Sequence, residues 1–133
     1  MNIQEIIEVI RTDESIGLSE EDISDFENNT DWHFPKEYKE ILLSVDGGYG
    51  QIGKYYVDFW NLNDICFYYE NMESLEGLIP FASDGCGIAF AFDINDDAIF
   101  SIPMDCLEKI YAKKIATNFC DFLDKLIAQD LDY

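Results

Sequence analysis

Basic residues are scarce in this sequence. Its 133 residues include 8 Lys and Arg against 28 Asp and Glu, with one His, which gives a formal charge of −20. This charge disfavours binding to the phosphates of nucleic acids and to anionic lipid surfaces, because both would repel the protein. It favours binding to a basic surface. We therefore expect a protein partner, and neither a nucleic acid nor a membrane.

Long apolar runs are also absent. The longest uninterrupted one, residues 88–92, is far shorter than the roughly 20 residues that span a bilayer. The beginning of the chain lacks the basic segment and long apolar segment of a secretory signal. These two absences predict a cytoplasmic protein.

Core-forming residues are nevertheless plentiful. Apolar residues make up 48% of the chain and aromatic residues 15%, which excludes a disordered acidic tail. The length is typical of one domain, and the chain contains neither an internal repeat nor a linker rich in Gly, Ser and Pro. We therefore predict a single domain over residues 1–133.

The four cysteines lack the close pairing of a zinc site, because no two are separated by only two residues. They are Cys66, Cys86, Cys106 and Cys120. Two disulfides are conceivable, but a chain with this much apolar material does not need them to fold. Buried free thiols in a reducing compartment are the favoured interpretation, and no metal or other cofactor is expected.

The first part of the chain carries three helix patterns. Asn2 and Glu5 have the spacing of a capping box and introduce isoleucines at helical spacing, namely Ile3, Ile6, Ile7 and Ile10. Ser19 is a second predicted N-cap, because three acidic residues follow it. Pro35 suits the first position of a third helix, which the glycines at 47–48 should end.

Short apolar runs bounded by turn residues follow. The predicted strands cover residues 55–60, 78–82, 88–92 and 98–102. Residues 62–70 fit either a short helix or another strand, whereas a helical apolar stripe predicts a last helix over 115–127. Helices first, strands next and a helix last predict an α+β fold, with helices packed around a central, mainly antiparallel β-sheet.

Two local motifs match binding sites only in part. Residues 48–53 read GxGxxG, but the dinucleotide motif must lie between a strand and a helix, and these glycines follow a helix. We interpret them as a helix-to-strand turn. Residues 93–97 begin like a calcium loop, yet Ala98 and Met104 occupy the positions that require Gly and Glu. A polar hairpin turn is the favoured interpretation, and an adventitious cation site remains the alternative.

Catalytic residues are not indicated. A Ser or Cys nucleophile usually requires a His base, and His33 is the sole histidine of the sequence. Its neighbours Trp32 and Phe34 favour a packed or surface histidine over a catalytic one. Pairs of carboxylates carry no information here, because 28 acidic residues produce many by chance. We therefore expect that the protein is not an enzyme.

The distribution of charge is more informative than its total. Residues 12–35 contain eight acidic residues and residues 55–108 eleven, and neither stretch contains a Lys or Arg. General acidity for solubility is one explanation, and an acidic docking surface bordered by aromatic residues is the sharper one. We expect a third of six clustered aromatics to be exposed: Tyr49, Tyr55, Tyr56, Trp60, Tyr68 and Tyr69. The candidate partner-interface residues are Tyr49, Trp60, Glu70, Glu73, Asp84, Asp96 and Asp97.

Three segments follow one another along residues 19–129: the Pro-x-x-Tyr helix from Phe34 to its Asp-Gly-Gly stop at Gly48, the Asp- and Gly-rich turn at 79–93, and the closing segments at 102–103 and 115–123. In this order they resemble the SUKH superfamily of Smi/Knr-like proteins. The resemblance implies an α+β fold and a helix rather than a strand over 62–70. It supplies no catalytic residues.

The resemblance also implies a function. Bacterial members of the superfamily are mostly immunity proteins that bind and neutralise a cognate polymorphic or contact-dependent toxin, often a nuclease. We therefore expect a toxin with a basic active-site surface as the partner. The alternative is a non-enzymatic regulatory or scaffold module like the fungal members. The toxin's identity, the binding face and the oligomeric state stay open.

Overall fold

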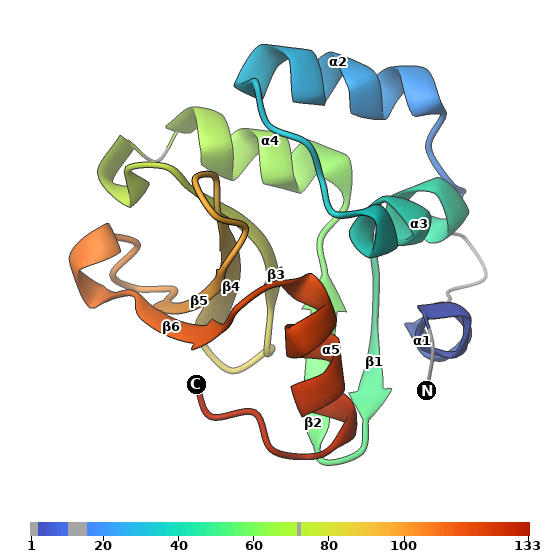
Figure 1. Cartoon of the computed structure of the whole chain (residues 1–133), viewed down its shortest axis with the longest axis vertical. Helices are drawn as coiled ribbons and strands as arrows, with labels where there is room; N and C mark the ends of the chain where they lie inside the picture. Colours follow the sequence, from blue (N-terminus) through green and yellow to red (C-terminus); the bar gives the residue numbers. More distant parts are fainter. Residues whose placement is uncertain (1–2, 11–15, 72) are drawn as a thin grey trace.

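Helices surround one sheet in the computed structural model of the chain, which describes residues 3–10, 16–71 and 73–133 (Figure 1). The helices are α1 (Ile3–Ile10), α2 (Glu20–Thr30), α3 (Lys36–Val45), α4 (Leu62–Asn71) and α5 (Phe119–Ile127), with short 3₁₀ turns η1 (Glu73–Leu75) and η2 (Lys109–Tyr111). The strands are β1 (Gly48–Ile52), β2 (Tyr55–Phe59), β3 (Leu78–Ser83), β4 (Ile88–Asp93), β5 (Ile99–Pro103) and β6 (Lys113–Ala116). The α+β class is confirmed. None of the described helices is long and apolar enough to cross a membrane.

The sheet is a meander, because its six strands lie side by side in chain order and every neighbouring pair is antiparallel. The predicted mainly antiparallel sheet is therefore confirmed. A β-bulge interrupts the pairing of β3 with β4, since Pro80 faces Ala91 and Ala82 faces Phe90. Phe81 is the extra residue, and its carbonyl accepts a hydrogen bond from the Trp60 N–H at 2.8 Å.

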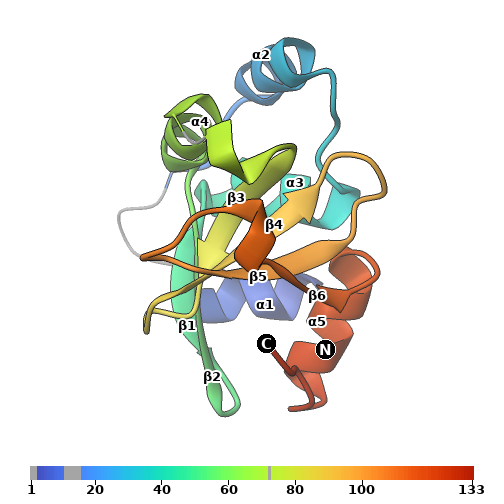
Figure 2. The ribbon, with the colours of Figure 1, turned by 90° about the vertical axis from the view of Figure 1, so that its left-hand side faces the viewer.

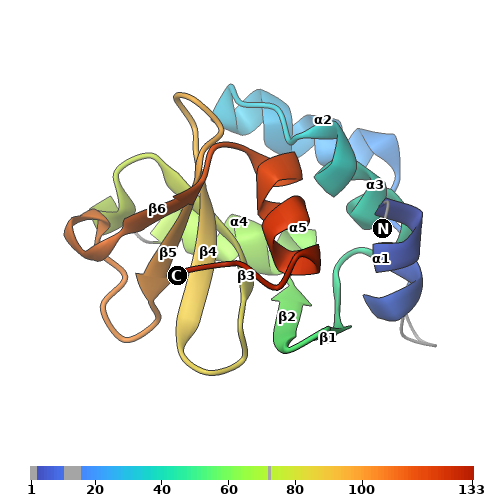
Figure 3. The ribbon, with the colours of Figure 1, turned by 60° about the horizontal axis from the view of Figure 1, so that its bottom comes forward.

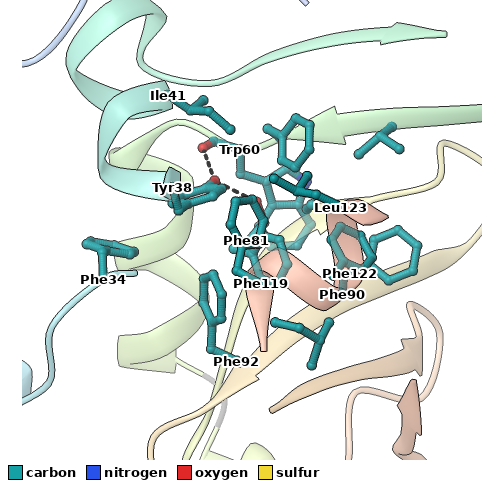
Figure 4. Packing of buried hydrophobic residues seen from close by; sticks show 14 of the residues in the cluster. Phe34, Tyr38, Ile41, Trp60, Phe81, Phe90, Phe92, Phe119, Phe122 and Leu123 are labelled. Atoms are coloured by element: carbon teal, nitrogen blue, oxygen red, sulfur yellow. Dashed lines mark hydrogen bonds between the residues drawn. The ribbon is translucent and has the colours of Figure 1, made fainter. Parts of the chain in front are cut away.

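One face of the sheet packs on α3 and α5 through aromatic rings (Figure 4). Phe81 and Phe92 of the sheet are stacked with centroids 4.1 Å apart, and Phe119 of α5 lies 5.8 Å from the first and 5.9 Å from the second. Tyr38 of α3 is fully buried and reaches all three rings. Side chains alternate along a strand, so the second face carries a separate, smaller cluster of Leu75, Leu78, Ala91 and Ile102.

The helices lie at three places around the sheet (Figure 2 and Figure 3). Helix α1 packs beside β1, the first edge strand, and α5 lies against the sheet next to α3. Helix α4 contacts β3, and α2 lies over α4 at the outside of the molecule. The helix form of residues 62–70, which the family resemblance implied, is therefore confirmed.

The predicted helix starts agree with the structure, with small shifts. Ser19 caps α2 in a capping box, and its N3 partner is Asp22. Pro35 is the N-cap of α3 rather than its first residue. The predicted Asn2 cap of α1 lies outside the described residues.

Two segments differ from the sequence-based expectation. The glycine-rich residues 48–53 were expected to form a turn, but 48–52 form strand β1, because the absence of side chains at Gly48 and Gly50 lets α1 approach. A Cβ atom on Gly50 would lie 2.9 Å from the carbonyl oxygen of Val9. Ile115 belongs to strand β6 and not to the last helix, which begins only after the N-cap Asn118.

Candidate protein-binding surface

A pocket of about 220 Å³ opens where α3, β1, β2 and α4 meet. We call it the acidic pocket. Its lining consists of Asp46, Gly47, Gly48, Tyr49, Asp58, Phe59, Trp60, Asn61 and Asp64. Three of these residues carry a carboxylate, and the lining includes no Lys or Arg.

Asp46 connects the two helices that border the acidic pocket. It ends α3 in the left-handed conformation, at φ 47°, and its N–H donates to the Leu42 carbonyl. Its Oδ1 accepts a hydrogen bond of 3.0 Å from the Leu62 N–H, at the start of α4. Asn61 caps the same helix, because its Oδ1 accepts from the Asp64 N–H at 2.9 Å. These bonds fix Asp46 and Asp64 around one helix start.

Gly47 allows the chain to pass through this crowded point. Its φ of 90° is unfavourable for other residues, and a Cβ atom there would lie 2.6 Å from the Phe59 carbonyl oxygen. The Asp-Gly-Gly segment after α3 is thus a structural requirement for bringing β2 beside the end of α3. The motif that carries the family resemblance builds the pocket.

Two carboxylates of the acidic pocket, Asp46 and Asp58, have raised pKa values. Burial raises the pKa of Asp58, and the neighbouring Asp64 carboxylate raises it further. Burial also raises the pKa of Asp46; the Leu62 N–H opposes this shift, whereas Asp22 and Asp64 add to it. A cation in the pocket would relieve this repulsion.

Aromatic rings border the acidic pocket on its strand side. Tyr49 faces Asp58 across the β1–β2 pair, is 55% exposed and lies 6.2 Å from the ring of Tyr56, which is also exposed. Burial and the nearby Asp58 raise the pKa of Tyr56. Tyr49 and Tyr56 are the exposed members of the six clustered aromatics, so the expectation that a third would be exposed is confirmed.

A second depression, the α2–α4 groove, lies on the other side of α4 and has a volume of about 160 Å³. Its lining consists of Asp22, Asp25, Phe26, Asn29, Thr30, Leu62, Cys66, Tyr69 and Glu70. This lining likewise contains acidic residues and no Lys or Arg. Asp22 of the groove also raises the pKa of Asp46 in the acidic pocket, so the charge of one depression acts on the other.

The structure brings only some of the predicted interface residues together. Tyr49 and Trp60 both line the acidic pocket, and Glu70 lines the α2–α4 groove. Trp60 is only 7% exposed and its ring stacks on Tyr68 at 4.7 Å, so it is a wall of the pocket and not the exposed anchor that was expected. Glu73 is exposed in η1 and lines neither depression.

Asp84 was predicted as an interface residue, but the structure buries it. It is 8% exposed, and its Oδ1 accepts hydrogen bonds from the Cys86 N–H at 2.8 Å and the Ile88 N–H at 3.0 Å. Its Oδ2 accepts from the Tyr133 hydroxyl at 3.0 Å. Asp84 therefore organises the β3–β4 turn, and its charge is not available to a partner.

Asp96 and Asp97 are exposed in the β4–β5 turn, and neither lines the acidic pocket or the α2–α4 groove. Each already accepts a hydrogen bond: Asp96 from the Ala98 N–H at 3.0 Å, and Asp97 from the Trp32 indole N–H at 2.8 Å. The second bond ties the α2–α3 connection to this turn. Among the described residues, no group of three or more His, Cys, Asp or Glu side chains is arranged to hold a metal ion.

The cysteines are free, as expected, but three of them are not buried. Cys86, Cys106 and Cys120 are exposed, and Cys66 is half-buried in the α2–α4 groove. Cys86 lies in the turn between β3 and β4, Cys106 lies in the turn after β5, and Cys120 is an exposed position of α5, so apolar neighbours in the sequence do not bury these side chains. Burial and nearby carboxylates raise the pKa of Cys106 and Cys120, which disfavours their reactive thiolate forms.

His33 is exposed beside the first residues of α3, and its Nδ1 lies 3.5 Å from Oε1 of the buried Glu27. The same Glu27 oxygen lies 3.3 Å from Lys39 Nζ, and Oε2 accepts from the Phe34 N–H at 2.8 Å. These contacts hold the α2–α3 connection in place. The side chain beside the His33 ring is thus a carboxylate that holds this connection, and not a Ser or Cys nucleophile.

Three acidic residues that line the acidic pocket were not predicted as interface residues, namely Asp46, Asp58 and Asp64. Strand alternation could have indicated Asp58, because Val57 and Phe59 are the buried residues of β2. Asp46 was visible only as part of a helix stop. Asp64 gave no signal, since the helix that carries it could also have been a strand.

A meander sheet with helices on its face and edge, ended by a helix that packs in the core, defines the class of α+β domain to which the protein belongs. The sequence pattern of the SMI1/KNR4 family (SUKH-1) matches residues 17–125, which is most of the chain. The chain therefore belongs to the SMI1/KNR4 family. No curated protein sequence shows significant similarity to it.

Proposed function

We propose that this protein is an immunity protein, which binds a cognate polymorphic or contact-dependent toxin and neutralises it by stoichiometric occupation of its active-site surface. The observation that carries the proposal is the convergence of Asp46, Asp58 and Asp64 on a pocket without any basic lining residue. Family membership supports it, because the SUKH superfamily includes immunity proteins. The net charge of −20 supports it independently.

A nuclease is the toxin class that fits this surface. A nuclease presents a basic groove to its nucleic-acid substrate, and an acidic protein that covers the groove blocks substrate entry. Complementary charge also speeds capture, to association rates of about 10⁸–10⁹ M⁻¹s⁻¹ at low salt. Rapid capture matters because the toxin must be stopped before it cuts.

The proposed mode of action is binding without chemistry, inside the cytoplasm where an incoming nuclease would act. It requires no cofactor, no nucleic acid and no membrane. The repulsion among the pocket carboxylates supports this mode, because basic side chains of the toxin would remove an unfavourable interaction of the free protein.

The test is a titration against the toxin domain encoded beside this protein, at 50 mM and at 500 mM NaCl. We expect a one-to-one complex, inhibition of the toxin's nuclease activity at the same stoichiometry, and weaker binding at the higher salt concentration. The double variant Asp46→Asn/Asp58→Asn should weaken binding, whereas Asp105→Asn/Glu108→Gln, with the same change of charge away from the pocket, should not. No complex at micromolar concentration would refute the proposal.

The second candidate function is a regulatory scaffold module, favoured by the match to a family that also includes the fungal Smi/Knr-type regulators. Such a module would bind several cellular partners rather than one toxin. Capture from the native cell with the protein as bait distinguishes the two. A single toxin recovered in equal amount supports immunity, and a set of endogenous proteins supports the scaffold function.

A further inference from the structure

We propose that the α2–α4 groove is a subsite for one arginine side chain of the basic partner. The inference rests on the proposed function, which it deepens by assigning a specific residue type to a specific place. It concerns the groove between α2 and α4 and not the acidic pocket. The two helices that form the groove lie side by side (Figure 1).

The size of the groove fits a side chain rather than a metabolite. Its volume is about 160 Å³. Sites for small-molecule ligands usually have volumes of about 300–1,000 Å³. A single long side chain is the occupant that such a groove can enclose.

The floor of the groove suits the aliphatic part of an arginine. It is built by Phe26 and Leu62, both almost fully buried, and by the half-buried Tyr69, whose ring meets the Phe26 ring edge-on at 6.0 Å. Long basic side chains bury their methylene groups along apolar surface and keep the charged group at the rim. A guanidinium group at this position can also stack over the exposed part of an aromatic ring, which an ammonium does less well.

The rim of the groove supplies negative charge. Asp25 and Glu70 stand on opposite helices, and neither carboxylate is hydrogen-bonded or ion-paired to another described residue. Asp22 adds a third carboxylate, although its Oδ2 already accepts from the Ser19 hydroxyl at 2.9 Å. The Glu70 charge reaches into the groove, because together with burial it raises the pKa of the Cys66 thiol.

These features distinguish arginine from other occupants. A purely apolar side chain would leave the rim carboxylates without a counter-charge, and an anion would be repelled by three of them. Charge complementarity therefore selects a cation, and the apolar floor selects a cation with a long stem. Arginine is the interface residue that has both properties, and it is enriched among the residues that dominate binding energy.

The first experiment uses the full chain and two small probes that differ only in charge. N-acetyl-arginine amide and its neutral isostere N-acetyl-citrulline amide are titrated into isotope-labelled protein at low salt, and amide resonances are followed by NMR. We expect saturable shifts at Phe26, Cys66 and Tyr69 with the arginine probe, and about tenfold weaker binding of the citrulline probe. Equal binding of the two probes, or shifts confined to other regions, would overturn the inference.

Variants test whether the rim is responsible. Asp25→Asn/Glu70→Gln should abolish the arginine-dependent shifts, and Asp105→Asn/Glu108→Gln, which changes the charge equally at exposed positions outside the groove, should leave them unchanged. Both pairs replace exposed residues, and circular dichroism checks that both variants are folded. Loss of the shifts in both variants would contradict a local site.

The same variants separate this inference from the proposed function. In the titration with the toxin, the groove variant should lower affinity by about tenfold. If Asp46→Asn/Asp58→Asn weakens the complex and the groove variant does not, the groove inference fails and the immunity function stands. If no complex forms with the wild-type protein, the immunity function fails, and with it the assignment of the groove to a toxin residue.

Discussion

At the scale of single residues, Tyr38 connects the family motif to the sheet. Its hydroxyl oxygen lies 2.9 Å from the Trp60 carbonyl and 3.0 Å from the Phe81 carbonyl, in a fully buried site. Both carbonyls belong to irregular backbone, at the end of β2 and at the bulge of β3. The hydroxyl has one proton to donate to these two carbonyls, and the Phe81 carbonyl also accepts from the Trp60 N–H at 2.8 Å.

Replacing this hydroxyl tests its role. Tyr38→Phe keeps the ring contacts and removes the donor, so we expect a loss of about 1–3 kcal/mol in the free energy of unfolding, measured by urea denaturation. Tyr111→Phe is the matched control, because Tyr111 is 53% exposed. Similar stability of the two variants would contradict the proposed bonding.

Asp58, unlike Tyr38, is expected to lower the stability of the free protein. Burial and the neighbouring Asp64 carboxylate raise the pKa of Asp58, so its charge destabilises the folded protein at pH 7. Asp58→Asn should therefore stabilise the free protein by about 0.5 kcal/mol, a small value because Asp58 is partly exposed to solvent. The same change should weaken binding to the proposed toxin partner. A gain of stability together with a loss of affinity is expected of a residue kept for function rather than for folding.

The pH dependence of this effect has a defined sign. The pKa of Asp58 is higher in the folded protein than the unfolded value of 3.8, so the folded state holds the proton more tightly. Protonated Asp58 therefore stabilises the folded state. This contribution is fully present below pH 3.8 and is lost as the pH rises through the raised pKa. The stability advantage of Asp58→Asn should therefore be small at low pH and grow across this window. A constant difference would show that Asp58 titrates normally.

Sequence patterns identified single residues well where local chemistry decides, as at the Ser19 cap. They failed at Asp84, because its burial depends on Tyr133, which lies 49 residues further along the chain. The acidic pocket was missed for the same reason. Asp46, Asp58 and Asp64 come from three different elements, and only the folded chain brings them together.

At the scale of elements, the two edge strands were the hardest to predict. Strand β1 contains Gly48 and Gly50, and glycine is unfavourable in strands unless another part of the backbone approaches closely. Helix α1 provides that approach. Strand β6 has only four residues, and its apolar Ile115 happens to continue the periodicity of α5. Strands β3 and β4 were predictable because each contains a continuous run of buried residues.

The contact between α1 and β1 gives the next prediction. Gly50→Ala should destabilise the protein, because the new Cβ atom would lie 2.9 Å from the Val9 carbonyl oxygen and push α1 away. We expect a cost of about 1–3 kcal/mol and faster hydrogen exchange in α1. Gln51→Ala, at the exposed neighbouring position, is the control and should have little effect. Unchanged exchange in α1 would refute the contact.

At the scale of the whole molecule, charge dominates. The ion pairs found among the described residues involve Lys39, Lys113, Lys125 and His33, so most acidic residues in the described part of the chain lack a basic partner. A net charge of −20 opposes the compact state through self-repulsion. Burial of the large aromatic core offsets this repulsion.

The last prediction follows from this balance. Salt screens repulsion within the protein and attraction to a basic partner, with a Debye length of about 10 Å at 0.1 M. Raising NaCl from 20 to 500 mM should therefore raise the thermal unfolding midpoint of the free protein and lower its affinity for the proposed toxin partner. Sucrose at equal osmolality controls for general stabilisation by cosolutes, because it should not weaken the complex. An acidic surface that is used for binding should lower the stability of the free protein, because its charges repel one another. A midpoint that falls as NaCl is added would contradict this destabilisation by charge.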